Sequence, residues 1–102
     1  MKITIKQGFI EFRRVDKPKY SLFELERIEV NEQYQRRGHG CKLFNMMIEK
    51  IKPYRKLFCT THASNKIAHR FYEHMGMKME AVLPNHYYRG EPEIVYSQYP
   101  VS

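Results

Sequence analysis

The chain has 102 residues, enough for one globular domain with a single core and too few for a two-lobed enzyme. Its net charge of +7 at pH 7 and its isoelectric point near 9.5 favour a polyanionic partner, such as nucleic acid, a phosphorylated cofactor or an acidic protein surface. The apolar runs are too short to span a bilayer and the N-terminus carries no apolar signal segment, so we expect a cytoplasmic protein without a membrane partner.

The N-terminal third is predicted to form β-structure. Two short β-prone runs, residues 2–6 and 9–15, predict a hairpin because a Gln-Gly pair separates them. After a polar turn, a longer strand is expected from Tyr20 to Val30. Its apolar positions do not alternate strictly, so we expect a β-bulge between Leu25 and Ile28.

The sequence Gln-Arg-Arg-Gly-His-Gly at residues 35–40 lies between this strand and an amphipathic helix predicted for residues 41–52. Gly38 and Gly40 let the backbone approach a ligand closely, and the N–H groups of the first helical turn have no intrahelical partner. The helix dipole and the two arginines add positive potential. The pattern predicts a cradle for an anion with two linked phosphates, although an ordinary solvated loop has the same composition.

The second half of the chain continues with alternating strand and helix patterns. Residues 57–61 predict a buried strand, joined to the preceding strand through the helix as a βαβ unit with parallel strands. A second helix is expected to begin with a cap at Ser64 or Asn65 and to end at Gly76.

The C-terminal quarter predicts a closing hairpin. Its strands are expected at residues 77–84 and 93–99, around a long loop at residues 85–90. The predicted fold class is therefore α/β (α+β), one domain with a mixed twisted sheet, an N-terminal hairpin, a βαβ unit, a second helix and a C-terminal hairpin.

Two segments, in this order and at this spacing, resemble the GNAT superfamily of N-acetyltransferases. The first family signature, Q/R-x-x-G-x-G/A between a bulged strand and a helix, is matched by Gln35, Gly38 and Gly40. The second, an Asn followed by Ala and by an aromatic-Tyr-Glu-x-x-Gly end, is matched by Asn65, Ala68, Phe71, Tyr72, Glu73 and Gly76. The Asn-His-Tyr-Tyr segment at residues 85–88 looks like the ribosomal-protein alanine acetyltransferase branch of this family.

The resemblance implies a compact GNAT-like fold with acetyl-coenzyme A (acetyl-CoA) as cofactor. The cofactor's pyrophosphate would lie on the glycine turn and its pantetheine arm between the bulged strand and the second helix. The implied cofactor-binding residues are Ile28, Val30, Gln35, Arg36, Arg37, Gly38, His39, Gly40, Cys41, Asn65, Ala68 and Tyr72. Tyr72 would face the thioester sulfur and protonate, or hydrogen-bond, the departing thiolate. Asn65 and Tyr72 also have purely structural interpretations, as a helix cap and a core aromatic residue.

Two features depart from the family pattern. In the ribosomal branch the catalytic base is a Glu, and the matching position here is Thr60. Since other branches place a base on the bulged strand, Glu26 is the first candidate and Glu24 the second, and ion pairing beside Arg27 is the structural alternative for both. Family members also usually carry a strand and two helices before the first hairpin, whereas this chain starts at the hairpin.

The expected acceptor is an amine of a protein or peptide, either a lysine or an N-terminus, in an acidic setting. His86, Tyr87 and Tyr88 would border it, and a homodimer would supply a second wall. Three other functions remain open: an acetyltransferase of a small-molecule amine, a non-catalytic acyl-CoA-binding protein and a nucleic-acid-binding module. Nucleic acid is not favoured as a partner, because it would leave Tyr72 without a role.

No metal site is expected from the histidines. His69 and His74 lie five positions apart, on different faces of the second helix, and no cysteine pair joins them at zinc spacing.

Overall fold

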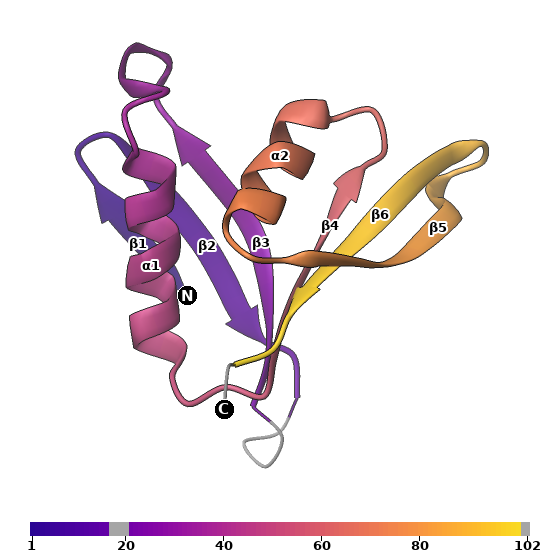
Figure 1. Ribbon diagram of the computed structural model, residues 1–102, viewed down its shortest axis with the longest axis horizontal. Coiled ribbons are helices and arrows are strands. Elements are labelled where there is room, and N and C mark those ends of the chain that lie inside the picture. The colour runs from indigo at the N-terminus through magenta and orange to yellow at the C-terminus, as the bar shows by residue number, and fades with distance from the viewer. Residues whose placement is uncertain (17–20, 101–102) are drawn as a thin grey trace.

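The chain folds into a six-stranded mixed sheet in the order β1-β2-β3-β4-β6-β5 (Figure 1). The computed structural model describes residues 1–16 and 21–100, without the side chains of residues 86–88. Its elements are β1 (Lys2–Ile5), β2 (Gly8–Arg14), β3 (Leu22–Val30), a short 3-10 helix (Glu32–Tyr34), α1 (His39–Ile51), β4 (Lys56–His62), α2 (Lys66–His74), β5 (Lys78–Tyr88) and β6 (Glu91–Gln98). This architecture confirms the predicted α+β fold class.

A β-bulge in β3 controls which side chains face the core. Leu25 and Arg27 pair with consecutive residues of β2, so Glu26 is the extra residue. Because the bulge shifts the alternation, Leu25 before it and Ile28 and Val30 after it all pack on the same core. The predicted bulge is confirmed, and it brings two apolar side chains of β3 to the cleft described below.

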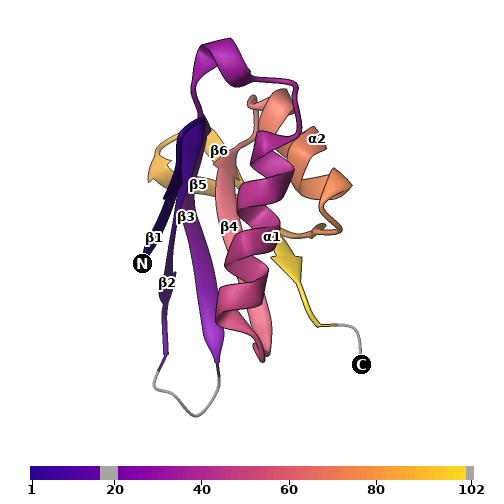
Figure 2. The same ribbon diagram turned by 90° about the vertical axis from the view of Figure 1, so that its left-hand side faces the viewer.

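Both helices lie on one face of the sheet, as the view in Figure 2 shows. The predicted apolar stripe of α1 is confirmed, although the helix begins earlier than expected, at His39. The buried core between the helices and the sheet comprises Ile10, Phe12, Phe23, Leu25, Leu43, Phe44, Met47, Ile51, Tyr54, Leu57, Cys59, Tyr72, Met77, Ile94 and Tyr96. Along its full length the opposite face of the sheet carries no helix within residues 1–16 and 21–100; we call it the helix-free face.

The parallel strands β3 and β4 pair over a short distance. Residues 22–24 of β3 pair with residues 56–58 of β4, and in the described structure no further pairs join them. β3 nevertheless continues to Val30 and β4 to His62, and Figure 1 shows the two strands separating above the shared segment. The backbone groups along these separated edges are therefore free of partners from the neighbouring strand. We call this opening the β3–β4 gap.

The C-terminal hairpin differs from the expected one. The predicted loop at residues 85–90 is wrong, because β5 runs on to Tyr88 and only Arg89 and Gly90 connect it to β6. Gly90 has a φ of 79°, which suits a tight hairpin turn, and its N–H donates to Asn85 Oδ1 at 2.6 Å. The strand is also strongly bulged: Leu83 pairs with Glu93, while the next pair is Tyr88 with Glu91.

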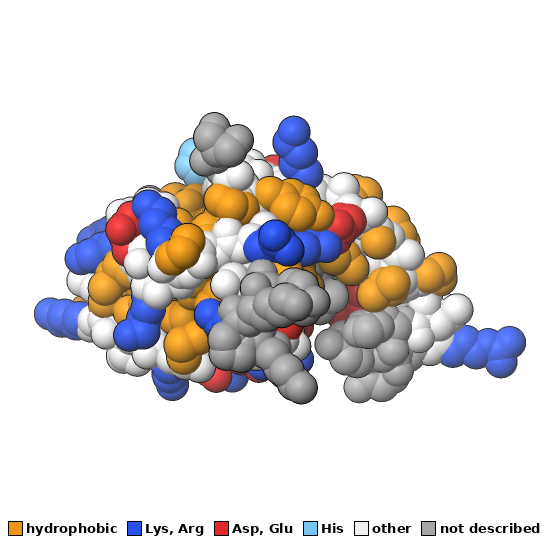
Figure 3. All heavy atoms as spheres, turned by 90° about the horizontal axis from the view of Figure 1, so that it is seen from below, with side chains coloured by type: hydrophobic (Ala, Val, Ile, Leu, Met, Phe, Trp, Pro, Cys, Tyr) orange, Lys and Arg blue, Asp and Glu red, His pale blue; other side chains and the backbone are white. Residues whose placement is uncertain are grey.

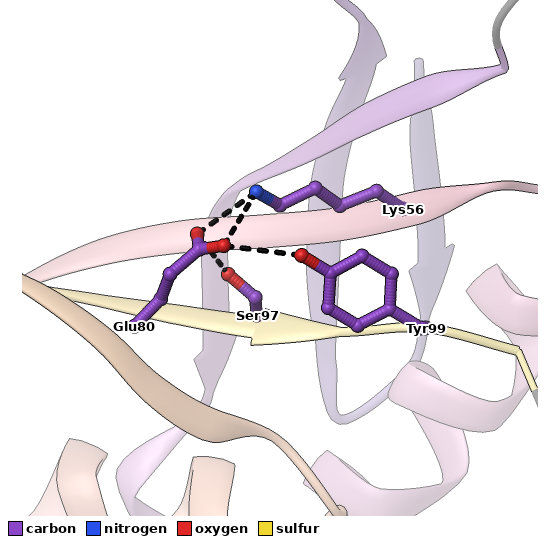
Figure 4. Close-up of polar contacts among 4 residues, drawn as sticks. All are labelled: Lys56, Glu80, Ser97 and Tyr99. Carbon is purple, nitrogen blue, oxygen red and sulfur yellow. Dashed lines mark hydrogen bonds and ion pairs between the residues drawn. The ribbon is translucent and has the colours of Figure 1, made fainter.

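A polar cluster joins three strands where β5 carries its other bulge. Glu80, the extra residue between Met79 and Ala81, accepts hydrogen bonds from Lys56 at 2.8 Å, Ser97 at 2.6 Å and Tyr99 at 3.1 Å (Figure 4). The Lys56 ammonium, followed by the Ser97 hydroxyl, lowers the pKa of Glu80 from 4.5 to about 2.

Among the described residues, no helix is long and apolar enough to cross a membrane.

Candidate active site

A cleft of about 770 Å³ lies between the end of β3, the start of α1 and one side of α2. Every sequence-predicted cofactor residue except Arg37 lines it. The lining consists of Ile28, Val30, Tyr34, Gln35, Arg36, Gly38, His39, Gly40, Cys41, Thr61, Asn65, Ile67, Ala68, Arg70, Phe71 and Tyr72. Residues from three separate parts of the sequence thus meet around one cavity, which has the size of a typical small-molecule site.

The glycine turn forms one end of the cleft, and its two glycines do different things. Gly38 is the N-terminal cap of α1 with φ 81°, a left-handed conformation, and a Cβ added there would meet no protein atom within 4 Å. At Gly40 an added Cβ would lie 3.2 Å from the Phe71 ring. Gly38 therefore keeps the mouth of the turn open, whereas Gly40 allows α1 to pack closely against α2.

The turn presents donors and positive charge to the cleft. Because Gly38 has no side chain to cap the helix, the N–H groups of the first turn of α1 are left for a ligand. Arg36, at φ 65°, is itself in the left-handed region. Gln35 fixes the turn to the end of β3, since its Nε2 donates to the Val30 carbonyl oxygen at 3.0 Å. This combination suits a phosphate-containing anion.

Tyr72 lies at the inner end of the cleft, where α2 packs on the sheet. Its side chain is 8% exposed and its hydroxyl lies beside the Cys59 thiol of β4. Burial, reinforced by Cys59, raises the pKa of Tyr72, and burial raises the pKa of the Cys59 thiol to about 12. Both groups therefore stay protonated at neutral pH, and Tyr72 is placed to donate a hydrogen bond.

Asn65 has the structural role anticipated for it, as the cap of α2. Its Oδ1 accepts the Ala68 N–H at 3.1 Å. Its Nδ2 donates to no residue in the described part of the chain, and the side chain lines the cleft. The cap therefore uses Oδ1 and leaves the Nδ2 donor of the same amide beside the cleft.

The two predicted base candidates lie outside the cleft lining. Glu24 accepts a hydrogen bond from Arg13 Nε at 2.9 Å, and Glu26 lies 3.8 Å from the same nitrogen. The partner is therefore Arg13 of the adjacent strand rather than Arg27, which pairs with Glu29 at 2.6 Å. The side chains of His86, Tyr87 and Tyr88 are outside the described structure, so their predicted contact with the acceptor has no structural test.

The sequence reasoning missed part of the lining. Arg70, Ile67 and Phe71 all line the cleft from α2, and Ile67 is 78% exposed. A spacing of three and four residues places these side chains on one side of a helix, so helical periodicity alone would have added Arg70 to the predicted cations. Within the described residues, Arg70 forms no ion pair.

The chain belongs to the GNAT family of acetyltransferases, since the model of that family matches residues 7–77. A search of curated protein sequences gives no significant match.

Solved structures with the same fold include a protein described as a GNAT-family acetyltransferase from Desulfovibrio desulfuricans. It is 27% identical with a TM-score of 0.83, and the alignment covers 91% of this chain and 60% of that one. A GNAT-family acetyltransferase from Elizabethkingia anophelis with acetyl-CoA bound is 20% identical with a TM-score of 0.80, and the alignment covers 92% of this chain and 69% of that one. The ribosomal-protein-S18-alanine N-acetyltransferase from Escherichia coli is 24% identical with a TM-score of 0.76, and the alignment covers 91% of this chain and 61% of that one. The likeness to the last two is one of fold, so the resemblance to the ribosomal branch stays a prediction.

Proposed function

We propose that this chain is an acetyl-CoA-dependent N-acetyltransferase that acetylates an amine of a protein or peptide. The observation that carries the proposal is the cleft, in which the glycine turn, the separated edge of β3 and Tyr72 line one continuous cavity. Membership of the GNAT family supports the same chemistry, as does the acetyl-CoA bound to the Elizabethkingia structure.

The residues of the cleft fit this cofactor. The open space in front of Gly38 suits a diphosphate, because a Cβ would be the first atom to occupy it. Arg36 and Arg70 line the cleft and form no ion pair within the described structure, so both are available to phosphate oxygens. In the β3–β4 gap, the free backbone edge beside Ile28 suits an amide-containing arm that pairs like an added strand. Acetyl-CoA supplies an acetyl thioester as the acyl donor.

Tyr72 is proposed to stabilise negative charge at the inner end of the cleft. Its raised pKa makes complete loss of its proton to a thiolate strongly uphill, because even an unperturbed phenol of pKa about 10 is a weaker acid than a thiol of pKa about 8.5. A hydrogen bond from the neutral hydroxyl is the role that its surroundings support. The neighbouring Cys59, on β4, holds that hydroxyl against the sheet.

The acceptor must lose a proton before it attacks. At pH 7 this costs about 1 kcal/mol for an α-amine of pKa near 7.7 and nearly 5 kcal/mol for a lysine of pKa about 10.4. The family pattern suggests Glu26 and Glu24 on β3 as candidate bases, but both carboxylates are directed toward the Arg13 guanidinium. An α-amine needs little help, so a weak base suffices for an N-terminal acceptor.

Charge and shape support a macromolecular acceptor. Within the described residues no helix covers the helix-free face, from which an acceptor reaches the β3–β4 gap, and such an open face suits a macromolecule. A net charge of +7 attracts an acidic protein and repels cationic amines. Figure 3 shows Lys and Arg side chains scattered among hydrophobic ones on the face seen from below.

Both acceptor classes occur among structures with this fold. One is the NatC complex bound to a Gag peptide and CoA, which is 18% identical with a TM-score of 0.80, and another is an aminoglycoside 6'-N-acetyltransferase with coenzyme A, 17% identical with a TM-score of 0.78. A small-molecule amine is therefore the second candidate acceptor.

The function is tested in two steps. Calorimetry with acetyl-CoA measures binding, and mass spectrometry then compares acetyl transfer to folded proteins with transfer to a panel of free amines, at low and high salt. We expect micromolar binding and salt-sensitive labelling of acidic proteins. Salt-insensitive turnover of a free amine with no labelled protein would select the small-molecule acceptor, and binding without any turnover would indicate an acyl-CoA sensor.

A further inference from the structure

On the helix-free face, one carboxylate has a buried oxygen without a hydrogen-bond partner among the described residues. Glu93 is 8% exposed, and none of the described residues donates a hydrogen bond to its buried Oε2. Buried carboxylate oxygens are normally paired, because loss of hydration without a replacement hydrogen bond destabilises the fold. An exception on an otherwise well-packed strand indicates that the group serves something other than stability.

The sheet places Glu93 next to the part of β4 that lines the cleft. Thr61 of β4 lines the cleft and pairs with Ile94 of β6. The next pair along the same ladder, His62 with Glu93, points to the opposite face because side chains alternate. Glu93 therefore lies at the level of the cleft, with the sheet between them.

The β3–β4 gap connects the two faces at this level. Pairing between the strands ends at Glu24 and Phe58, so within the described residues β4 has no strand partner on that side from Cys59 to His62. An amine that approaches from the helix-free face passes along this edge of β4 before it reaches the end of the cleft marked by Tyr72. Glu93 is on β6, the strand that pairs with the other edge of β4, and its side chain shares the helix-free face with Thr60.

The other carboxylates beside the gap are already engaged. Glu24 and Glu26 share the Arg13 guanidinium on the far side of the gap. Their carboxylate oxygens are directed to that guanidinium and not toward an incoming amine. Glu93 has no such partner in the described structure.

Building on the proposed function, we propose that Glu93 is the group that takes the proton from the acceptor amine. The ammonium of the acceptor transfers one proton to the Glu93 carboxylate, which leaves a neutral amine with a free lone pair and a neutral carboxylic acid. No oxidant, metal or further reactant is needed. The titratable side chains facing Glu93 from the described elements are His62 on β4 and Glu91 on its own strand, while the opposite residue of β5 is the apolar Leu83.

The test compares Glu93→Gln with Glu91→Gln, an exposed glutamate of the same strand. The acceptor probe is a synthetic acidic peptide with one lysine, and kcat/KM is measured from pH 6 to 10. We expect Glu93→Gln to lose about 10²–10⁴-fold near pH 7 and to recover as the pH rises, because solvent then deprotonates the lysine. Glu91→Gln should follow the wild-type profile, and Glu93→Asp should keep the shape of the profile at a lower rate.

The melting temperature of the Glu93→Gln variant distinguishes a catalytic role of Glu93 from a structural one. Since Gln buries no charge, Glu93→Gln should melt at or above the wild-type temperature while losing activity. A lower melting temperature with the activity loss, or an unchanged kcat/KM, would overturn the proposal.

A binding measurement keeps the inference separate from the proposed function. Adding the same peptide to the acetyl-CoA-free protein should shift the backbone amide NMR signals of His62 and Glu93, and the Glu93→Gln variant should weaken this binding. If wild-type protein neither binds acetyl-CoA nor transfers acetyl groups, the proposed function fails, and the peptide titration still decides whether Glu93 receives an amine. No shift at His62 and Glu93 would count against the site.

Discussion

The two faces of the sheet are built in different ways. The cleft contains three backbone features: a glycine turn at a helix start, an edge of β3 that has no strand partner among the described residues, and the capped start of α2. The helix-free face is made from side chains, among them the Arg13 ion pairs, the Glu80 cluster and the buried Glu93. Recognition by backbone groups changes little when side chains are substituted, whereas recognition by side chains can change while the fold stays the same.

The largest effect is expected from a substitution that blocks the phosphate site of the glycine turn. Gly38→Val should weaken acetyl-CoA binding at least about 100-fold by calorimetry, because the branched side chain strains a left-handed residue and fills the space in front of the turn. Gly90→Val is the matched control, since Gly90 has nearly the same φ, 79° against 81°, and equal open space in the β5–β6 turn. Both variants should lose similar stability, but only the first should lose binding. Equal binding by the two would contradict the phosphate cradle.

The next effect concerns the side chain at the inner end of the cleft. Tyr72→Phe should lower turnover about 10- to 100-fold and leave acetyl-CoA affinity nearly unchanged, as expected for one hydrogen bond to a developing charge. The control is Tyr96→Phe, which removes the hydroxyl of an adjacent core tyrosine that donates to Glu73 at 3.2 Å. If both variants lose the same small amount of activity, Tyr72 is a packing residue.

A smaller effect is expected at the paired carboxylates of β3. Glu24→Gln and Glu26→Gln should each change turnover less than about threefold, because each loses an interaction with Arg13 at a partly exposed site. Initial rates with the lysine peptide are the measurement. A loss near 100-fold in either variant, with a shifted pH profile, would assign the base to β3 and not to Glu93.

The smallest effect is one of stability and depends on pH. Because the folded-state pKa of Glu80 is lowered from 4.5 to about 2, its ion pair stabilises the fold above pH 4.5, and this stabilisation is lost as the pH falls toward 2. Glu80→Gln should melt about 5 °C below wild type at pH 7, with the difference shrinking between pH 5 and 2. The control is Glu49→Gln, since Glu49 forms an exposed ion pair with Lys52 of the same 2.8 Å length. A melting-temperature difference that stays constant from pH 5 to pH 2 would show that the charge of Glu80 does not stabilise the fold.

The sequence predicted the cleft face well because its determinants are local. Gly38, the bulge after Leu25 and the cap at Asn65 each depend on residues within a few positions, and each was found where expected. The acceptor side depends on cross-strand neighbours, which sequence spacing does not reveal. Thus Glu24 and Glu26 were paired with Arg27 instead of Arg13, and nothing in the pattern of β6 distinguished the buried Glu93 from an exposed one.

The extent of β5 was misjudged for a related reason. Its polar and aromatic residues from Asn85 to Tyr88 have the composition of a loop, but aromatic residues also favour strands, and Gly90 permits a very short turn. The bulge between Leu83 and Tyr88 begins at Pro84, which cannot donate a ladder hydrogen bond and therefore favoured the prediction that the strand ends there.

The short ladder between β3 and β4 also divides the sheet mechanically. In the described structure only three paired positions join the two halves of the sheet edge to edge. We therefore expect β3 and β4 to separate more easily than neighbouring strands within either half. An arm that pairs with both free edges would act as a temporary seventh strand. In amide hydrogen exchange, the N–H groups of Cys59 to His62 that face β3 should therefore exchange quickly in the free protein and become protected when acetyl-CoA is added, whereas those in the β2–β3 ladder should change little.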